Sequence, residues 1–180
     1  ATAAALPYDG PFGFIGMVLV TPQFRRRGIA TKLVDRCIAE LQGRGLTPVL
    51  DATATGAEVY RRQGFLPQCG FDRWEGVIDG SVGDAGQDRH AALAQVSDAD
   101  ADAFGAMRAE LLGDFLGRDG TLLAAAGSGK GFALLRRGRR ALQAGPVVAG
   151  SETAALESLR RLFSMARGAV FIDVPSVWAG

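Results

Sequence analysis

The stretch Arg25-Arg26-Arg27-Gly28-Ile29-Ala30 decides how this sequence is interpreted. It follows an apolar run from Phe14 to Val20, typical of a strand, which Thr21-Pro22 closes. Beyond it, apolar residues recur at helical spacing: Ile29, Leu33, Val34, Cys37, Ile38 and Leu41. The sequence therefore predicts a strand, a short loop rich in arginine, and a helix that begins near Gly28.

The start of this predicted helix is suited to bind an anion. Unpaired backbone N–H groups and the positive end of the helix dipole meet there, and a diphosphate fits such a site. Gly28 lets the backbone turn and approach the anion closely, and Ala30 keeps the next position small. The three arginines also fit a nucleic-acid patch, but the glycine and helix around them favour a cofactor phosphate.

Two motifs resemble those of the Gcn5-related N-acetyltransferase (GNAT) superfamily. Arg25-x-x-Gly28-x-Ala30 is similar to its acyl-CoA loop, Gln/Arg-x-x-Gly-x-Gly/Ala. Downstream, Ala57 to Phe65 resembles a second motif, in which a tyrosine, here Tyr60, precedes a Gly-Phe pair. The resemblance covers Ala1 to about Trp74, and it implies an α/β fold with a mixed sheet, the acyl-CoA N-acyltransferase fold.

The resemblance also implies an activity, N-acetyl transfer from acetyl-CoA to a primary amine, and roles for particular residues. Backbone groups of the strand end would bind the pantetheine arm, and the N–H of Leu19 or Val20 would polarise the thioester carbonyl. Tyr60 would be the general acid that protonates the leaving thiolate. The residues expected to bind acetyl-CoA are Val18, Leu19, Val20, Arg25, Arg26, Arg27, Gly28, Ile29, Ala30, Thr31 and Thr53.

The sequence departs from the family pattern at two places. Thr53 stands where the family often has Asn, and it lacks the paired hydrogen-bonding groups of an amide. The strand from Phe12 to Val20 contains no Glu or Asp to act as general base, so Asp9, Asp51, a preceding segment and water all stay open. These departures keep an alternative in view, a non-catalytic acyl-CoA-binding or regulatory module. The acceptor is a small-molecule or peptide amine of unknown identity.

The sequence predicts two domains joined by a linker. We expect an acetyltransferase domain over residues 1–76, a glycine-rich linker over 77–90 and a second domain over 91–180. Family members usually have two strands and two helices before the segment at which this chain begins, so we expect the first domain to be incomplete at its N-terminus. The elements expected in it are strands at Ala1–Tyr8, Phe12–Thr21, Thr47–Thr53 and Phe65–Gly76, and helices at Gly28–Gln42 and Gly56–Gln63.

The second half repeats the strand–helix–strand order in a degenerate form. Strands are expected at Ala141–Ala149 and Ala169–Val174, on either side of a helix at Ser151–Ala166. Before them, Ser97 is expected to cap a helix from Asp98 to about Leu116. No Arg-x-x-Gly-x-Ala motif precedes the Ser151 helix, and Glu152 puts negative charge at its start. We therefore expect an acetyltransferase-like half that does not bind acyl-CoA strongly.

Composition excludes several other classes. The net charge of +1 favours neither a nucleic-acid partner nor a membrane partner, and no apolar run is long enough to span a bilayer. Two cysteines, Cys37 and Cys69, and one histidine, His90, provide no disulfide framework and no metal-ligand pattern. We expect a cytoplasmic protein without a metal. Its oligomeric state stays open.

Overall fold

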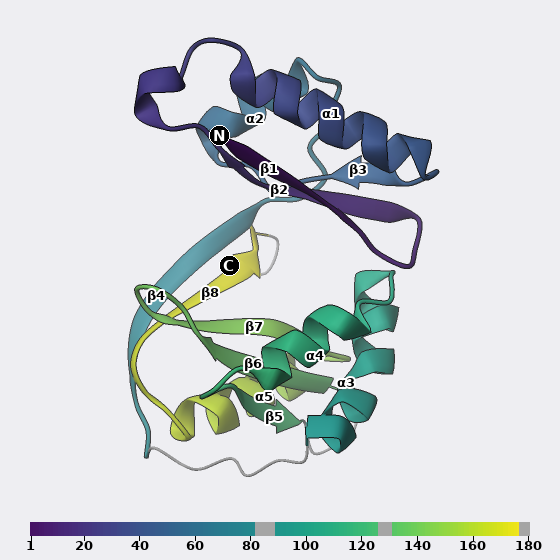
Figure 1. The fold of residues 1–180 in the computed structure, drawn as a ribbon. Coiled ribbons are helices and arrows are strands. Elements are labelled where there is room, and N and C mark those ends of the chain that lie inside the picture. The colour runs from purple at the N-terminus through teal and green to yellow at the C-terminus, as the bar shows by residue number, and fades with distance from the viewer. Residues whose placement is uncertain (82–88, 126–130, 177–180) are drawn as a thin grey trace. The chain divides into compact units, whose positions relative to one another are not determined.

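A computed structural model of the chain describes residues 1–81, 89–125 and 131–176 (Figure 1). The chain divides into two compact units. The first unit comprises Ala1–Gln68 together with Gly105–Met107, and the second comprises Cys69–Phe104 together with Arg108–Gly180.

The first unit is a three-stranded sheet with two helices. Strands β1 (Thr2–Pro7) and β2 (Phe12–Leu19) form an antiparallel hairpin, and β3 (Thr47–Val49) pairs with β2 in parallel. A 3-10 turn, η1 (Pro22–Phe24), and helix α1 (Ile29–Gly43) connect β2 to β3. Helix α2 (Ala54–Arg61) follows β3. The strands expected at Ala1–Tyr8 and Phe12–Thr21 are present, whereas β3 is shorter than the strand expected at Thr47–Thr53.

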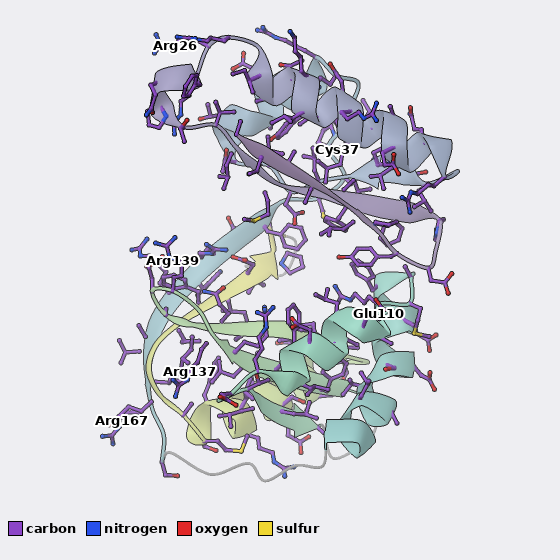
Figure 2. All side chains as sticks on the ribbon, viewed as in Figure 1. Arg26, Cys37, Glu110, Arg137, Arg139 and Arg167 are labelled. Carbon is purple, nitrogen blue, oxygen red and sulfur yellow. The ribbon has the colours of Figure 1, made fainter. Side chains whose placement is uncertain are left out.

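Helix α1 buries its apolar face against the sheet. Val34, Cys37 and Leu41 are buried with Ile15 of β2, and Figure 2 shows Cys37 on the side of the helix that faces the strands. Gly13 allows this close approach, since a Cβ atom there would lie 2.5 Å from Cδ2 of Leu41. The helical spacing of apolar residues thus gives both the element and the face that it buries.

The second unit is a five-stranded sheet in the order β4-β8-β7-β6-β5. Helices α3 and α4 pack on the face that includes Phe132 and Leu134, and α5 packs on the face that includes Ala133 and Leu135. Its elements are β4 (Phe71–Asp79), α3 (Arg89–Phe104), α4 (Ala109–Gly117), β5 (Leu122–Ala125), β6 (Gly131–Arg137), β7 (Leu142–Ala149), α5 (Glu152–Ser164) and β8 (Arg167–Pro175).

The structure corrects the expected end of the first sheet. Strand β4, which we expected to complete the first domain, pairs along its whole length with β8, from Phe71↔Pro175 to Asp79↔Arg167. Periodicity alone cannot say which sheet a strand joins, because an apolar face packs equally well in either. The compact units consequently divide after Gln68, while the predicted domain limits at 76 and 90 stay a prediction. Much of the predicted linker, residues 82–88, lies outside the described residues.

The expected helix from Asp98 to Leu116 is also wrong. Two helices occupy this stretch, and Gly105, with a φ of +79°, lies between them. Ser97 is not a cap but lies inside α3, where its hydroxyl donates to the carbonyl of Leu93 at 2.8 Å. A serine hydroxyl that bonds to the preceding helical turn has a partner inside the helix. Serine at this position therefore did not mark a helix start.

Candidate functional site

The candidate site lies along the part of β2 that is no longer paired with β3. Strand β2 pairs with β3 only at Phe12, Gly13 and Phe14, because β3 ends at Val49. From Ile15 to Leu19, β2 continues without a β3 partner on that edge. The pairing of the two parallel strands therefore ends at Phe14 and leaves backbone groups of β2 available to an extended ligand.

A β-bulge shapes the open part of β2. The pairing with β1 changes register between Thr2↔Leu19 and Ala4↔Gly16, so β2 carries one extra residue. Met17 adopts a left-handed φ of +53°, which is uncommon for a non-glycine residue, and its carbonyl accepts a hydrogen bond from Oγ1 of Thr2 at 2.9 Å. Met17 and Leu19 are 67% and 58% exposed. The bulge thus presents apolar side chains at the strand end.

The loop after β2 turns through two left-handed residues. Backbone bonds from Phe24 to Thr21 and from Arg25 to Pro22 close η1. Arg26 then has a φ of +61°, and Gly28, the N-cap of α1, has a φ of +71°. A Cβ atom on Gly28 would meet nothing within 4 Å, so the backbone angle, and not crowding within the chain, favours glycine.

The first turn of α1 is left open. Its cap has no side-chain hydrogen bond and its first turn has no acidic residue. The first intrahelical bond runs from Lys32 N–H to Gly28 carbonyl, so the N–H groups of Ile29, Ala30 and Thr31 precede the helical ladder. An anion at this point would meet unpaired donors and the positive end of the helix dipole.

Three exposed arginines surround this helix start, and they differ in how they are held. The Nε of Arg25 donates to the carbonyl of Val20 at 3.0 Å, which ties the loop to the end of β2. The Arg27 guanidinium lies 5.5 Å from the centre of the Phe24 ring. Figure 2 shows Arg26 extending outward from the loop. Together they put positive charge next to the open first turn.

Helix α2 carries the two other predicted site residues. Tyr60 is half-buried, and its ring meets Phe65 edge-on, with centroids 6.1 Å apart, beside the core of the first unit. Thr53 is the N-cap of α2, and its hydroxyl oxygen accepts from the N–H of Gly56 at 3.2 Å. The Thr53 hydroxyl thus caps α2, a role that the sequence analysis did not predict.

Gln63, just after α2, forms hydrogen bonds with the first turns of α1, next to the candidate anion site. Its Nε2 donates to the carbonyl of Thr31 at 3.2 Å and to Oδ1 of Asp35 at 2.7 Å. The segment that carries Tyr60 is therefore anchored on the first turns of α1. Sequence reasoning did not assign roles to Gln63, Thr2 or Met17, since contacts between distant segments leave no local pattern.

The second unit repeats this strand geometry, but the start of its corresponding helix, α5, is capped. Strand β7 pairs in parallel with β8 from Leu142 to Ala144 and then bulges opposite Leu134, at Gly145. At the start of α5, however, the Ser151 hydroxyl accepts from the N–H of Ala154 at 3.2 Å, and Glu152 occupies the first turn. A capped, acidic helix start disfavours a phosphate.

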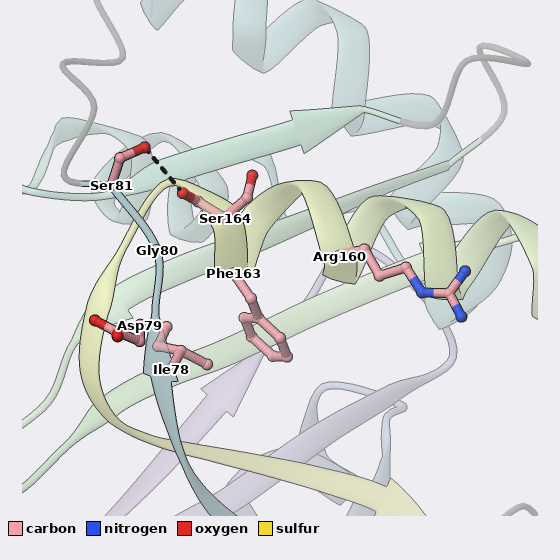
Figure 3. A pocket seen from close by; sticks show the side chains of 7 residues that line it. All are labelled: Ile78, Asp79, Gly80, Ser81, Arg160, Phe163 and Ser164. Carbon is pink, nitrogen blue, oxygen red and sulfur yellow. Dashed lines mark hydrogen bonds between the residues drawn. The ribbon is translucent and has the colours of Figure 1, made fainter.

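The second unit also has a pocket, which none of the predicted site residues lines. It has a volume of about 540 Å³, and Figure 3 shows Gly80 crossing the C-terminal end of α5 beside it. A Cβ atom on Gly80 would lie 2.4 Å from the Ser164 carbonyl oxygen, so this contact requires glycine. The lining residues are Ile78, Asp79, Gly80, Ser81, Arg160, Phe163 and Ser164.

The part of the chain that the structure describes lacks two other kinds of feature. No group of three or more His, Cys, Asp or Glu side chains could hold a metal ion there. Within the same residues, no helix is long and apolar enough to cross a membrane.

Comparison with known families identifies an acetyltransferase domain in each half of the chain. Residues 1–71 match the model of the Acetyltransferase (GNAT) family, and residues 96–179 match that of an Acetyltransferase (GNAT) domain. No curated protein matches the chain in sequence. The chain belongs to the GNAT superfamily, with one GNAT match in each half.

Solved structures show the same fold. A proposed acetyltransferase from Pyrococcus horikoshii is 26% identical, with a TM-score of 0.74 over 97% of this chain and 59% of its own. GNAT proteins from Sphaerobacter thermophilus and Kribbella flavida are 19% and 18% identical, with TM-scores of 0.56 and 0.54. They match 97% and 96% of this chain, and 67% and 50% of theirs. The fold is the acyl-CoA N-acyltransferase fold, and this chain spans about 59% of the length of the Pyrococcus protein.

Proposed function

We propose that the first unit binds acetyl-CoA and transfers its acetyl group to a primary amine. The observation that carries this proposal is the uncapped start of α1, preceded by left-handed Gly28 and three arginines, at the end of the unpaired edge of β2. Family and fold support acyl transfer as the general chemistry. The donor, the amine acceptor and the activity of this chain are the proposal.

Each part of the site has a task in binding. The N–H groups from Arg26 to Thr31 and the Arg25 side chain would hold the pyrophosphate. The open edge of β2 would pair with the pantetheine arm as an added strand, at Val18 to Val20. The exposed side chains of Met17 and Leu19 offer apolar contact beside that edge.

The chemistry needs a proton for the leaving sulfur and an acceptor for the proton of the amine. The amine nitrogen bonds to the thioester carbon, the C–S bond breaks, and the nitrogen loses a proton. The N–H of Leu19 or Val20 would stabilise the carbonyl oxygen as it gains charge. Tyr60 would protonate the sulfur. Strand β2 has no carboxylate for the amine proton, so a base from elsewhere or water must take it.

The experiment compares two substitutions at Gly28 by calorimetric titration with acetyl-CoA. Asn and Asp have nearly the same size, and both tolerate a left-handed φ better than other side chains, so the pair differs in charge. We expect Gly28→Asn to retain most of the affinity of the parent and Gly28→Asp to lose at least about tenfold, because a carboxylate would face the pyrophosphate. Equal affinity of the two variants, or no binding by the folded parent, would contradict the proposed site.

The alternative is a non-catalytic acyl-CoA-binding module. The absence of a carboxylate on β2 favours it. Release of free CoA thiol in the presence of a panel of primary amines separates the two functions. An enzyme releases thiol in proportion to the amine supplied, whereas a binding module takes up acetyl-CoA without turnover.

A further inference from the structure

Arg136 stands out because it is a charged side chain in a row of buried apolar residues on β6. On β6 it continues the row of Phe132 and Leu134, two buried residues on the face that α3 and α4 cover. Arg136 is half-buried, and its guanidinium carbon lies 4.0 Å from the centre of the Phe115 ring of α4. At this distance the guanidinium makes a cation–π contact with the ring.

One nitrogen of Arg136 is occupied by the bulge of the neighbouring strand. Its Nε donates to the carbonyl of Gly145 at 2.9 Å. In the first unit, the corresponding bulge carbonyl, that of Met17, accepts from the neutral hydroxyl of Thr2 at the same distance. The second half therefore places a cation where the first half uses a hydroxyl.

The charged groups around Arg136 are cations that already have partners. Arg108 forms a bidentate pair with buried Asp100, at 2.7 and 2.8 Å. Arg118 pairs with Asp114 and lies 5.2 Å from the centre of the same Phe115 ring. Burial lowers the pKa of Arg136, and the charges of Arg118 and Arg108 lower it further.

Arg136 itself has no carboxylate partner within residues 1–81, 89–125 and 131–176. Its hydrogen bond to Gly145 uses Nε, and the two terminal nitrogens carry the remaining donors of the fork. Arg108 and Arg118 are each paired with a carboxylate, so the Arg136 guanidinium over the Phe115 ring is left as one uncompensated positive charge.

We propose that Arg136, stacked on Phe115 beside Arg118, forms a binding site in the second unit for a small carboxylate ligand. A planar carboxylate matches the guanidinium fork, and a single negative charge matches the single unpaired cation. The site differs from the candidate pyrophosphate site, because the start of α5 is closed by Ser151 and Glu152. It also does not depend on the proposed acetyl transfer.

The test is an NMR titration of the full chain with sodium acetate, with sodium chloride at equal ionic strength as the reference. We expect saturable shifts of the Gly145 and Phe115 backbone amides that chloride does not reproduce. Arg136→Gln should weaken acetate binding at least about tenfold, because the amide cannot supply the charged fork. Arg137→Gln is the matched control, since Arg137 is the exposed neighbour on the same strand, and it should leave the titration unchanged.

Several outcomes would overturn the inference. They are shifts in acetate that match those in chloride, equal binding by Arg136→Gln and the parent, or tighter binding of inorganic phosphate than of acetate. If Arg136→Gln does not give a folded amide spectrum, Arg118→Gln replaces it, and we then expect a severalfold loss because the ligand loses a nearby positive charge. Unchanged binding in that variant would also count against the site.

Discussion

Tyr60 occupies a position that combines packing with access. Its ring is half-buried against Phe65 and the core of the first unit, which fixes the side chain, and Gln63 holds the same segment on α1. A phenol fixed in this way can present a proton to a leaving group without reorganising, which is what a general acid requires.

We expect Tyr60→Phe to lower kcat by about 10²–10⁴-fold with acetyl-CoA and an accepted amine. The dissociation constant for acetyl-CoA should stay within about twofold, since the ring and its packing remain. Steady-state rates and calorimetry on both proteins measure the two effects. A variant that loses affinity together with rate would indicate a packing role, and unchanged kcat would exclude Tyr60 as the acid.

The two cysteines provide a second prediction at the scale of residues. Cys37 is buried on α1, and burial raises the pKa of its thiol, whereas Cys69 is exposed. The reactive thiolate of Cys37 is therefore disfavoured, and a thiol reagent should reach the exposed Cys69 first. A thiol reagent at pH 8 should modify one cysteine quickly in the native protein and two in denaturant. Rapid modification of both in the native protein would contradict the packing of α1.

At the scale of elements, β4 and β8 are joined by a charged cross-strand pair. Arg73 and Asp173 lie opposite each other in the register and form two hydrogen bonds of 2.7 and 2.8 Å. The hydrogen bond from Arg73, aided by its charge, lowers the pKa of Asp173 below its ordinary value. A lowered pKa stabilises the fold above the unfolded value of about 3.9, and this contribution is lost as pH falls through the folded value.

We expect Asp173→Asn to reduce the free energy of unfolding at pH 7 by less than about 1 kcal/mol, because both side chains are half-exposed. The difference between parent and variant should shrink as pH falls below about 4. Denaturant titrations at several pH values measure it, and Arg73→Gln should behave in the same way. A difference that is independent of pH would show that the pair is not formed.

The sequence predicted which segments are helices and strands better than it predicted which strands pair. The apolar spacing from Ile29 to Leu41 predicted α1, and Ser151 predicted the start of α5, because both signals are local. The partner of β4 and the break at Gly105 were missed, since they depend on residues far along the chain and on the packing of two helices.

At the scale of the whole molecule, the two halves share a strand, bulge, helix and strand but differ at the helix start. Gly28 leaves α1 uncapped, whereas Ser151 and Glu152 close α5. One GNAT match in each half is consistent with a repeat of which only the first copy has the uncapped helix start. The difference between the two helix starts thus depends on a few residues at two equivalent positions.

We expect hydrogen exchange to reveal this asymmetry. Saturating acetyl-CoA should slow exchange of backbone amides at the start of α1 and along the open edge of β2, because bound donors open less often. Amides at the start of α5 should exchange at the same rate with and without the ligand. Equal protection of both helix starts would contradict the closure of the second site.

The sequence by itself determined the GNAT assignment, the arginine- and glycine-containing loop before α1, and the lack of that motif in the second half, because these depend on residues adjacent in the chain. Tertiary structure alone decided that β4 joins β8, that Thr53 caps a helix, and that Met17 forms a bulge held by Thr2. It alone also brought Arg136, Phe115 and Gly145 together. The reason is that hydrogen bonds and stacking between distant segments depend on distance in space, which no local pattern encodes.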